Sequence, residues 1–256
     1  MQIILASAKT MNEAPGSIAA QEAVSTPVFL AQAGRLAQEL AQQSATTLAR
    51  SLKCSPALAR TNVLRYHHFF DSDGRQPAIF AYNGTAYKHL AASSLTADEL
   101  SFAQHHLHIL SFLYGMLRPL DAIHPYRLEG SVRLAATGGE TLFSFWKPLL
   151  TEYLIRTVKA DDGILFHLAT EEFEHLFDWK RVERELTVIH PLFYVDNGQQ
   201  FKVMAMHAKA CRGTMTRHLI VHRANRTEEL TGFAYNGFIY QPNLGDELHP
   251  HYIKQI

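Results

Sequence analysis

The chain has 256 residues, of which 47% are hydrophobic and 19% charged, so it carries enough apolar side chains for one sizeable core and is neither disordered nor fibrous in class. Basic and acidic residues each count 24, so the overall charge does not indicate a polyanionic partner, and such a partner would need a local patch. Two cysteines are too few for a disulfide framework, and no apolar run is long enough to span a membrane. We therefore expect one cytoplasmic domain over residues 1–256 without membrane association.

The pattern of apolar residues predicts mixed secondary structure. The first half is expected to contain a strand at 1–6, helices at 27–42, 45–53 and 56–69, a strand at 77–81 ending in the Asn83-Gly84 turn, and a helix from the capping residue Thr96 to Phe112. The second half is expected to contain an irregular connection at 114–139, a helix at 145–159, a strand at 163–169, an acidic helix at 170–177, a hairpin of strands 186–195 and 200–206, a helix at 207–223, and short strands around Gly232 and Gly237. This order favours an α+β fold, a single domain with a mixed sheet surrounded by helices, over a doubly wound sheet.

Charge is distributed unevenly along the chain. Two stretches, 41–70 and 201–226, contain no acidic residue; the first holds Arg50, Lys53, Arg60 and Arg65, and the second holds Lys209, Arg212 and four further basic residues. They are either solvated helix faces or the walls of a cleft that binds phosphate. On a helix, Lys209, Arg212 and Thr216 share one face and form a row of donors, and Gly213 predicts that a backbone or a ligand approaches closely there. We also expect Lys9, at the end of the first strand, to meet Lys209 and Arg212 in one cleft.

Several motifs have a distinctive order and spacing. They are Ala8-Lys9-Thr10, Tyr114 to Asp121, Pro125 to Glu129, Phe145-Trp146, Leu168 to Glu172, Ala208-Lys209, Arg212-Gly213 and Leu230 to Phe233. In these motifs the chain resembles the YaaA family, which is named for a bacterial peroxide-stress protein, from the first strand to about Tyr240. Departures include Gly84-Thr85-Ala86-Tyr87, which has no carboxylate where the family pattern has an aspartate.

The resemblance implies an unusual single-domain α+β fold in the cytoplasm, with a positively charged cleft and a helix-hairpin-helix element that binds DNA. We expect duplex or structured DNA to be bound mainly through backbone phosphates, with little sequence specificity. It also implies a role in limiting oxidative DNA damage and in lowering free intracellular iron. Because no Cys-rich or His–carboxylate pattern has the spacing of an iron centre, we expect the iron effect to be indirect, with no cofactor and no bound metal. Two segments are candidates for the hairpin element, 110–115 and 45–69, and neither has its Gly-x-Gly.

Individual side chains allow alternatives. Arg118 and Arg127 either bind phosphate, with Tyr126 as a stacking face, or Arg127 only pins its loop through Glu129. His105 and His108 are expected on a solvated helix face. Cys211 is expected to be a small buried residue, the alternative being a thiolate favoured by Lys209 and Arg212.

Two functions from different classes remain open. One is a DNA-binding protein of the peroxide stress response. The other is an enzyme whose phosphate-bearing small substrate is held by basic side chains, with Glu172 as general base; those side chains are Lys9, Arg118, Arg127, Lys209 and Arg212. An enclosed, convergent pocket favours the second function, and an open basic groove favours the first.

Overall fold

The computed structural model describes residues 1–13, 24–224 and 227–256. Its first sheet has the strand order β4-β3-β1-β6-β7, in which β4 is the antiparallel member and the other four strands are parallel. The strands are β1 Gln2–Ala6, β3 Leu107–Ser111, β4 Gly115–Leu117, β6 Ile164–Leu168 and β7 Thr187–Ile189. All residues of β3 and nearly all of β1 and β6 are buried, as expected for parallel strands covered on both faces.

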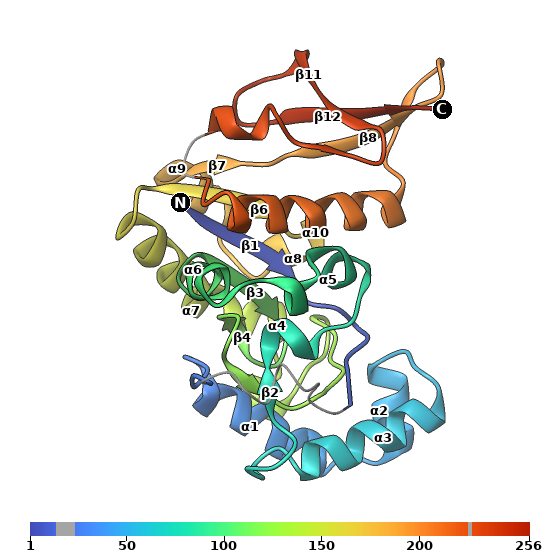
Figure 1. The fold of residues 1–256 in the computed structure, drawn as a ribbon. Helices are drawn as coiled ribbons and strands as arrows, with labels where there is room; N and C mark the ends of the chain where they lie inside the picture. Colours follow the sequence, from blue (N-terminus) through green and yellow to red (C-terminus); the bar gives the residue numbers. More distant parts are fainter. Residues whose placement is uncertain (14–23, 225–226) are drawn as a thin grey trace.

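A second sheet lies on the far side of one long helix. Its strand order is β10-β11-β12-β8-β9, with β8 Leu192–Asp196, β9 Phe201–Lys202, β10 Ala234–Tyr235, β11 Phe238–Gly245 and β12 Pro250–Gln255. Helix α10, Ala205–Val221, contacts β1 and β6 of the first sheet and β8 of the second, and Figure 1 shows it running between the two sheets. The side chains of α10 therefore reach the first sheet directly.

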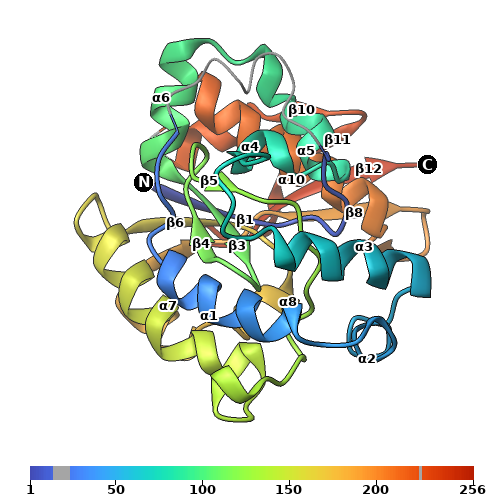
Figure 2. The same cartoon turned by 90° about the horizontal axis from the view of Figure 1, so that it is seen from below.

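The remaining elements surround the first sheet. The longer helices are α1 Leu30–Ala41, α3 Pro56–His67, α6 Ala97–His106 and α7 Leu142–Lys159; the shorter ones are α2 Ala45–Ser51, α4 Ala78–Ala81, α5 Thr85–Leu90, α8 Glu171–Glu174 and α9 Trp179–Glu185. A two-stranded ribbon pairs β2 Gln76–Pro77 with β5 Ala122–Ile123. Figure 2 shows α1, α2 and α3 gathered on one side of the molecule. The buried apolar side chains form one continuous cluster.

Local sequence explains where several helices begin. Ser55 accepts a hydrogen bond from the amide of Leu58, and Pro56 occupies the first turn of α3, where no amide partner is needed. Thr96 and Glu99 form the predicted capping box of α6. Such a cap contributes about 1 kcal/mol, so these signals place helix starts more reliably than helix ends.

Gly213 of α10 explains how closely α10 and α5 pack. A Cβ built at Gly213 would lie 1.9 Å from the carbonyl oxygen of Ala86 in α5. A side chain of any size would push the two helices apart. The close approach predicted at Gly213 is therefore made by the backbone of α5. Gly213 does not line a ligand-binding cavity.

The mixed architecture confirms the expected α+β fold class, and several predicted elements are wrong in detail. The predicted strand at 77–81 contains only the end of β2, and the chain then turns into α4 and α5. The helix from Thr96 ends at His106 because the apolar run Leu107–Ser111 enters the sheet as β3. Short buried runs of this kind fit a helix or a strand equally well in sequence. The predicted strand at 186–195 is divided between the two sheets as β7 and β8, and its turn to β9 is observed.

A helix-hairpin-helix element is not shown by the structure. The segment 110–115 joins β3 to β4, so it cannot supply two helices. Helices α2 and α3 do follow one another at 45–67, and the turn between them contains Lys53 with a positive φ. DNA binding by this helix pair stays a prediction. In the described part of the chain, no helix is long and apolar enough to cross a membrane.

Candidate anion-binding cavity

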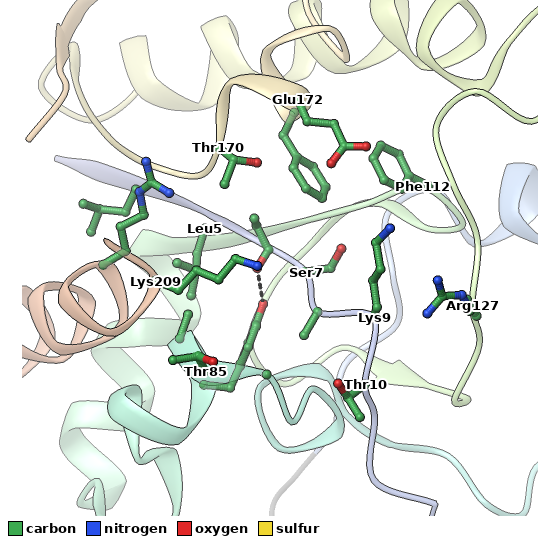
Figure 3. A pocket seen from close by; sticks show the side chains of 18 of the residues that line it. Leu5, Ser7, Lys9, Thr10, Thr85, Phe112, Arg127, Thr170, Glu172 and Lys209 are labelled. Carbon is green, nitrogen blue, oxygen red and sulfur yellow. Dashed lines mark hydrogen bonds between the residues drawn. The ribbon is translucent and has the colours of Figure 1, made fainter. Parts of the chain in front are cut away.

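A cavity of about 350 Å³ opens at the carboxyl ends of the parallel strands of the first sheet. Its wall is formed by the residues after β1, β3 and β6, the start of α5, the segment 126–128 and the exposed face of α10. Figure 3 shows Lys9, Arg127, Glu172 and Lys209 converging on it from four different elements. The carboxyl edge of a parallel sheet is where ligands bind in open α/β sheets, and the volume lies in the range of small-molecule sites.

Lys209 and Arg212 of α10 line the cavity as the helical spacing predicts. Within the described residues neither side chain has an ion-pair partner. The Nε of Arg212 is buried and has no hydrogen-bond partner, and burial lowers the pKa of its guanidinium. A buried cation without a bonded anion is costly, so Arg212 is suited to an anion that enters from the cavity.

Lys9 and Arg127 share one carboxylate. The Nζ of Lys9 lies 2.8 Å from Oε2 of Glu129, and a guanidinium nitrogen of Arg127 lies 3.1 Å from Oε1 of the same group. The Nε of Arg127 is buried and unpartnered. The ion pair of the loop-pinning alternative is therefore present, and Arg127 keeps one donor available beside the cavity. The predicted meeting of Lys9 with Lys209 and Arg212 is observed, because all three line one cavity.

Glu172 is the acidic member of the cavity wall. It follows β6 on the short helix α8 and faces Lys9 across the cavity in Figure 3. A smaller adjoining depression is lined by Lys9, Lys53, Arg127, Glu129, Ser131, Phe143 and Glu172. Lys53 thus extends the basic surface from the cavity toward α2 and α3.

Tyr126 lies at the inner wall and takes part in a chain of hydroxyl groups. Its hydroxyl is 2.6 Å from that of Ser111 and 2.9 Å from that of Tyr82. Burial raises the pKa of Tyr126, so its phenol stays protonated. The Tyr126 side chain is 5% exposed and packs edge-on against Tyr82 and Tyr114. The predicted open stacking face is therefore absent at this position.

Arg118 lies apart from the cavity wall. Its guanidinium donates to Oδ1 of the fully buried Asp121, at 2.9 Å, and to the carbonyl oxygen of Thr26, at 3.0 Å. Asp121 also accepts a hydrogen bond from the hydroxyl of Ser25. Arg118 thus joins two distant segments, which replaces the phosphate contact that the sequence predicted.

The first basic stretch is only partly brought to the cavity. Arg50 and Arg60 are exposed on α2 and α3, and Arg65 forms an ion pair with Glu13. Of the four basic residues predicted as a second patch, Lys53 is the one at the cavity margin. Arg226, in the second stretch, lies outside the described residues.

Two further predictions about single residues have clear outcomes. Cys211 is buried, which raises the pKa of its thiol to about 12, so the structure agrees with a buried packing residue and not with a stable thiolate. His105 is exposed as expected, whereas His108 lies in β3 and contacts the side-chain oxygen of Gln2 at 2.8 Å. The expectation of a solvated face is therefore wrong for His108.

Several wall residues were not predicted from the sequence. Thr85 and Thr170 bring hydroxyl groups to the wall, and Tyr87 donates to the carbonyl oxygen of Ala6 at 3.0 Å, which fastens α5 to the end of β1. A Cβ at Gly84 would lie 2.6 Å from the Cβ of Ala8. In the sequence the Asn83-Gly84 pair indicates a turn, and it does not indicate the close approach to Ala8.

Comparisons with known proteins agree with these motifs. The family profile described as peroxide stress protein YaaA matches residues 1–244. A UPF0246 protein of Bacteroides fragilis is 40% identical over 248 residues, covering 96% of each chain. A UPF0246 protein of Porphyromonas gingivalis is 41% identical over 251 residues, with 96% of this chain and 97% of the relative covered. One of Verminephrobacter eiseniae is 38% identical over 227 residues, covering 87% and 86%. The chain therefore belongs to the YaaA family of peroxide stress proteins.

Proposed function

We propose that the protein acts in the peroxide stress response by binding a phosphate-bearing ligand of nucleotide size in the cavity. The observation that carries this proposal is the state of Arg212, whose guanidinium is partly buried, has an unpartnered Nε and lacks an ion pair among the described residues. Lys9, Arg127 and Lys209 add three more cations, and among the described residues these are accompanied by Glu172 in the wall and by Glu129, which pairs with Lys9 and Arg127. Phosphate oxygens would accept hydrogen bonds from all four basic groups.

The size of the cavity favours a small ligand over a double helix. A volume of about 350 Å³ suits one nucleotide or a compound of similar size, and a DNA duplex is far too wide to enter it. If the ligand is a substrate, Glu172 is the wall residue able to act as general base, and Tyr126 supplies a protonated hydroxyl nearby.

Binding of DNA is the second candidate, and the position of Lys53 favours it. Lys53 lines the depression next to the cavity, so basic side chains continue beyond the cavity margin toward α2 and α3. An unpaired nucleotide could occupy the cavity while neighbouring backbone phosphates lie along this surface. Binding of this kind would protect DNA during peroxide stress, with any effect on free iron being indirect.

One series of ligands tests both candidates. A nucleoside monophosphate, a single strand, a duplex with an unpaired bubble and an intact duplex are titrated at several salt concentrations between about 50 and 200 mM. The first candidate predicts that the monophosphate binds and competes with the single strand. The second predicts that the bubble binds more tightly than the monophosphate, with a steep dependence on salt. If none of the four ligands binds, the proposal that the cavity is a phosphate site is wrong.

A further inference from the structure

A second group of polar side chains lies at the same edge of the first sheet, beyond Arg212. His167 is the penultimate residue of β6, Glu174 ends α8, and His190 directly follows β7. Each offers one ligand atom, and these atoms all lie within 4.8 Å of one another. Because β6 and β7 are parallel neighbours, their carboxyl ends bring the two histidines together although they are distant in sequence.

The histidine nitrogens in this cluster lack partners. His167 is 0% exposed, and neither of its ring nitrogens has a hydrogen-bond partner in the described structure. The Nε2 of His190 is also buried and unpartnered. Buried polar atoms are nearly always bonded to protein or to a bound species, so three orphaned nitrogens side by side point to a missing ligand.

The position of Glu174 fits a shared ion better than a hydrogen bond. Its Oε1 lies 3.1 Å from Nε2 of His167, yet that nitrogen makes no hydrogen bond of acceptable geometry. Two ligands of one tetrahedral zinc ion, each about 2.0 to 2.2 Å from the metal, lie roughly 3.3 Å apart. The rings of His167 and His190 lie 4.3 Å apart with 25° between their planes, so one ring has to turn for both nitrogens to point at one ion, and the ring of Trp179 packs edge-on against His167.

The kinds of side chain in the cluster match a metal site. Glu174 supplies the one carboxylate of the set, and Glu171 offsets the charge of Arg212. Two neutral imidazoles and a carboxylate are a common ligand set for divalent transition metals.

We propose that His167, Glu174 and His190 bind a divalent transition-metal ion of the zinc type. Three protein ligands leave a fourth position open, as in zinc sites that bind a water molecule or a substrate. The site does not depend on the anion cavity, because none of its three residues lines that cavity.

Calorimetric titration of the untagged, chelator-treated protein with Zn²⁺ tests the proposal. We expect one ion per chain for the unaltered protein, and a loss of affinity of at least about tenfold in Glu174→Gln and in His190→Gln. The matched control is Glu183→Gln, an exposed glutamate on the neighbouring helix α9, which should bind Zn²⁺ as the unaltered protein does. Titration with Co²⁺ adds a second readout, because its absorption bands report nitrogen and oxygen ligands directly.

The two variants lie on different elements, so one remains informative if the other does not fold, as judged by circular dichroism. Failure of the unaltered protein to bind either ion would overturn the proposal. Equal affinity in Glu174→Gln, His190→Gln and Glu183→Gln would also overturn it, because the ion would then be bound elsewhere, for example by Asp246 and His249.

Discussion

Replacing Arg212 by alanine gives the sharpest test of the anion cavity, because α10 also carries a matched control. Arg212 and Arg217 are five residues apart on the same helix, which is about 1.4 turns, and both are half-buried. Arg212 lines the cavity and has no ion pair among the described residues. Arg217 does not line the cavity and donates to the carbonyl oxygens of Leu90 and Ala91, each at 3.1 Å, where α5 ends. One arginine is thus available to a ligand, and the other is used by the fold.

The two substitutions should affect different quantities: Arg212→Ala the affinity for the ligand, and Arg217→Ala the stability of the fold. The Nε of Arg212 makes no hydrogen bond within the protein, so Arg212→Ala breaks none there. The free energy of unfolding should therefore change by less than about 1 kcal/mol. Affinity for a phosphate ligand should fall by about 1.5 to 3 kcal/mol, the range for a hydrogen bond to a charged group, which corresponds to roughly ten- to a hundredfold. Arg217→Ala should lower the free energy of unfolding by about 1.5 to 3 kcal/mol and leave the affinity for the phosphate ligand unchanged. Each kcal/mol lowers the melting temperature of a protein of this size by about 2 to 4 °C.

Both quantities are measured on the same preparations, by thermal melting and by titration with the nucleoside monophosphate or single strand. The reasoning is refuted if Arg212→Ala binds as tightly as the unaltered protein. It is also refuted if the two variants lose stability and affinity in the same proportion, because the loss of binding would then follow from unfolding.

Three further outcomes are expected. In Gly213→Ala the added Cβ meets the carbonyl oxygen of Ala86 at 1.9 Å, so the melting temperature should drop by several degrees, whereas Gly232→Ala, with open space around it, should change it little. The Cys211 thiol, with its pKa raised to about 12, should resist alkylation at pH 8 in the folded protein while the half-buried Cys54 reacts, as mass spectrometry would show; equal rates would contradict this. Burial lowers the pKa of His108 to about 4, below its unfolded value near 6.5. The unfolded chain therefore binds a proton first as the pH falls, so at most roughly 3 kcal/mol of the free energy of unfolding is present above pH 6.5 and is lost as the pH falls toward 4. In His108→Gln the free energy of urea unfolding should depend less on pH between these values, and a pH dependence equal to that of the unaltered protein would disprove the lowered pKa of His108.

Local signals in the sequence predicted much of the fold. The start of α6 follows from Thr96 and Glu99, and the start of α3 follows from Ser55 and Pro56, because a helix cap depends on residues a few positions apart. The exchange of helix for strand at Leu107–Ser111 has a different origin. Those five residues are buried between β1 and β4, and only the tertiary structure decides that they pair with other strands.

The candidate sites were predictable to different degrees for a related reason. Lys209 and Arg212 share a helix face, which the 3.6-residue period makes visible in sequence, and both line the cavity. His167 and His190 become neighbours only because β6 and β7 are adjacent and parallel, and no spacing rule expresses that pairing. A metal pattern was therefore not visible before the strand order was known.

The most specific part of the family signature, from Tyr114 to Glu129, has a role different from the one its composition indicated. Its glycines and prolines are not typical of a core element, and the sequence predicts phosphate contacts from Arg118 and Arg127. In the structure Tyr114, Leu117 and Tyr126 are buried, and Trp146 packs where a Cβ at Gly115 would lie, at 2.9 Å. The segment is thus an irregular part of the core. Its Arg127 and Glu129 reach the cavity margins because the buried residues before them hold the backbone in place. A change at Tyr114 or Asp121 should therefore weaken ligand binding only through the stability of this segment, whereas a change at Arg212 acts on the ligand directly.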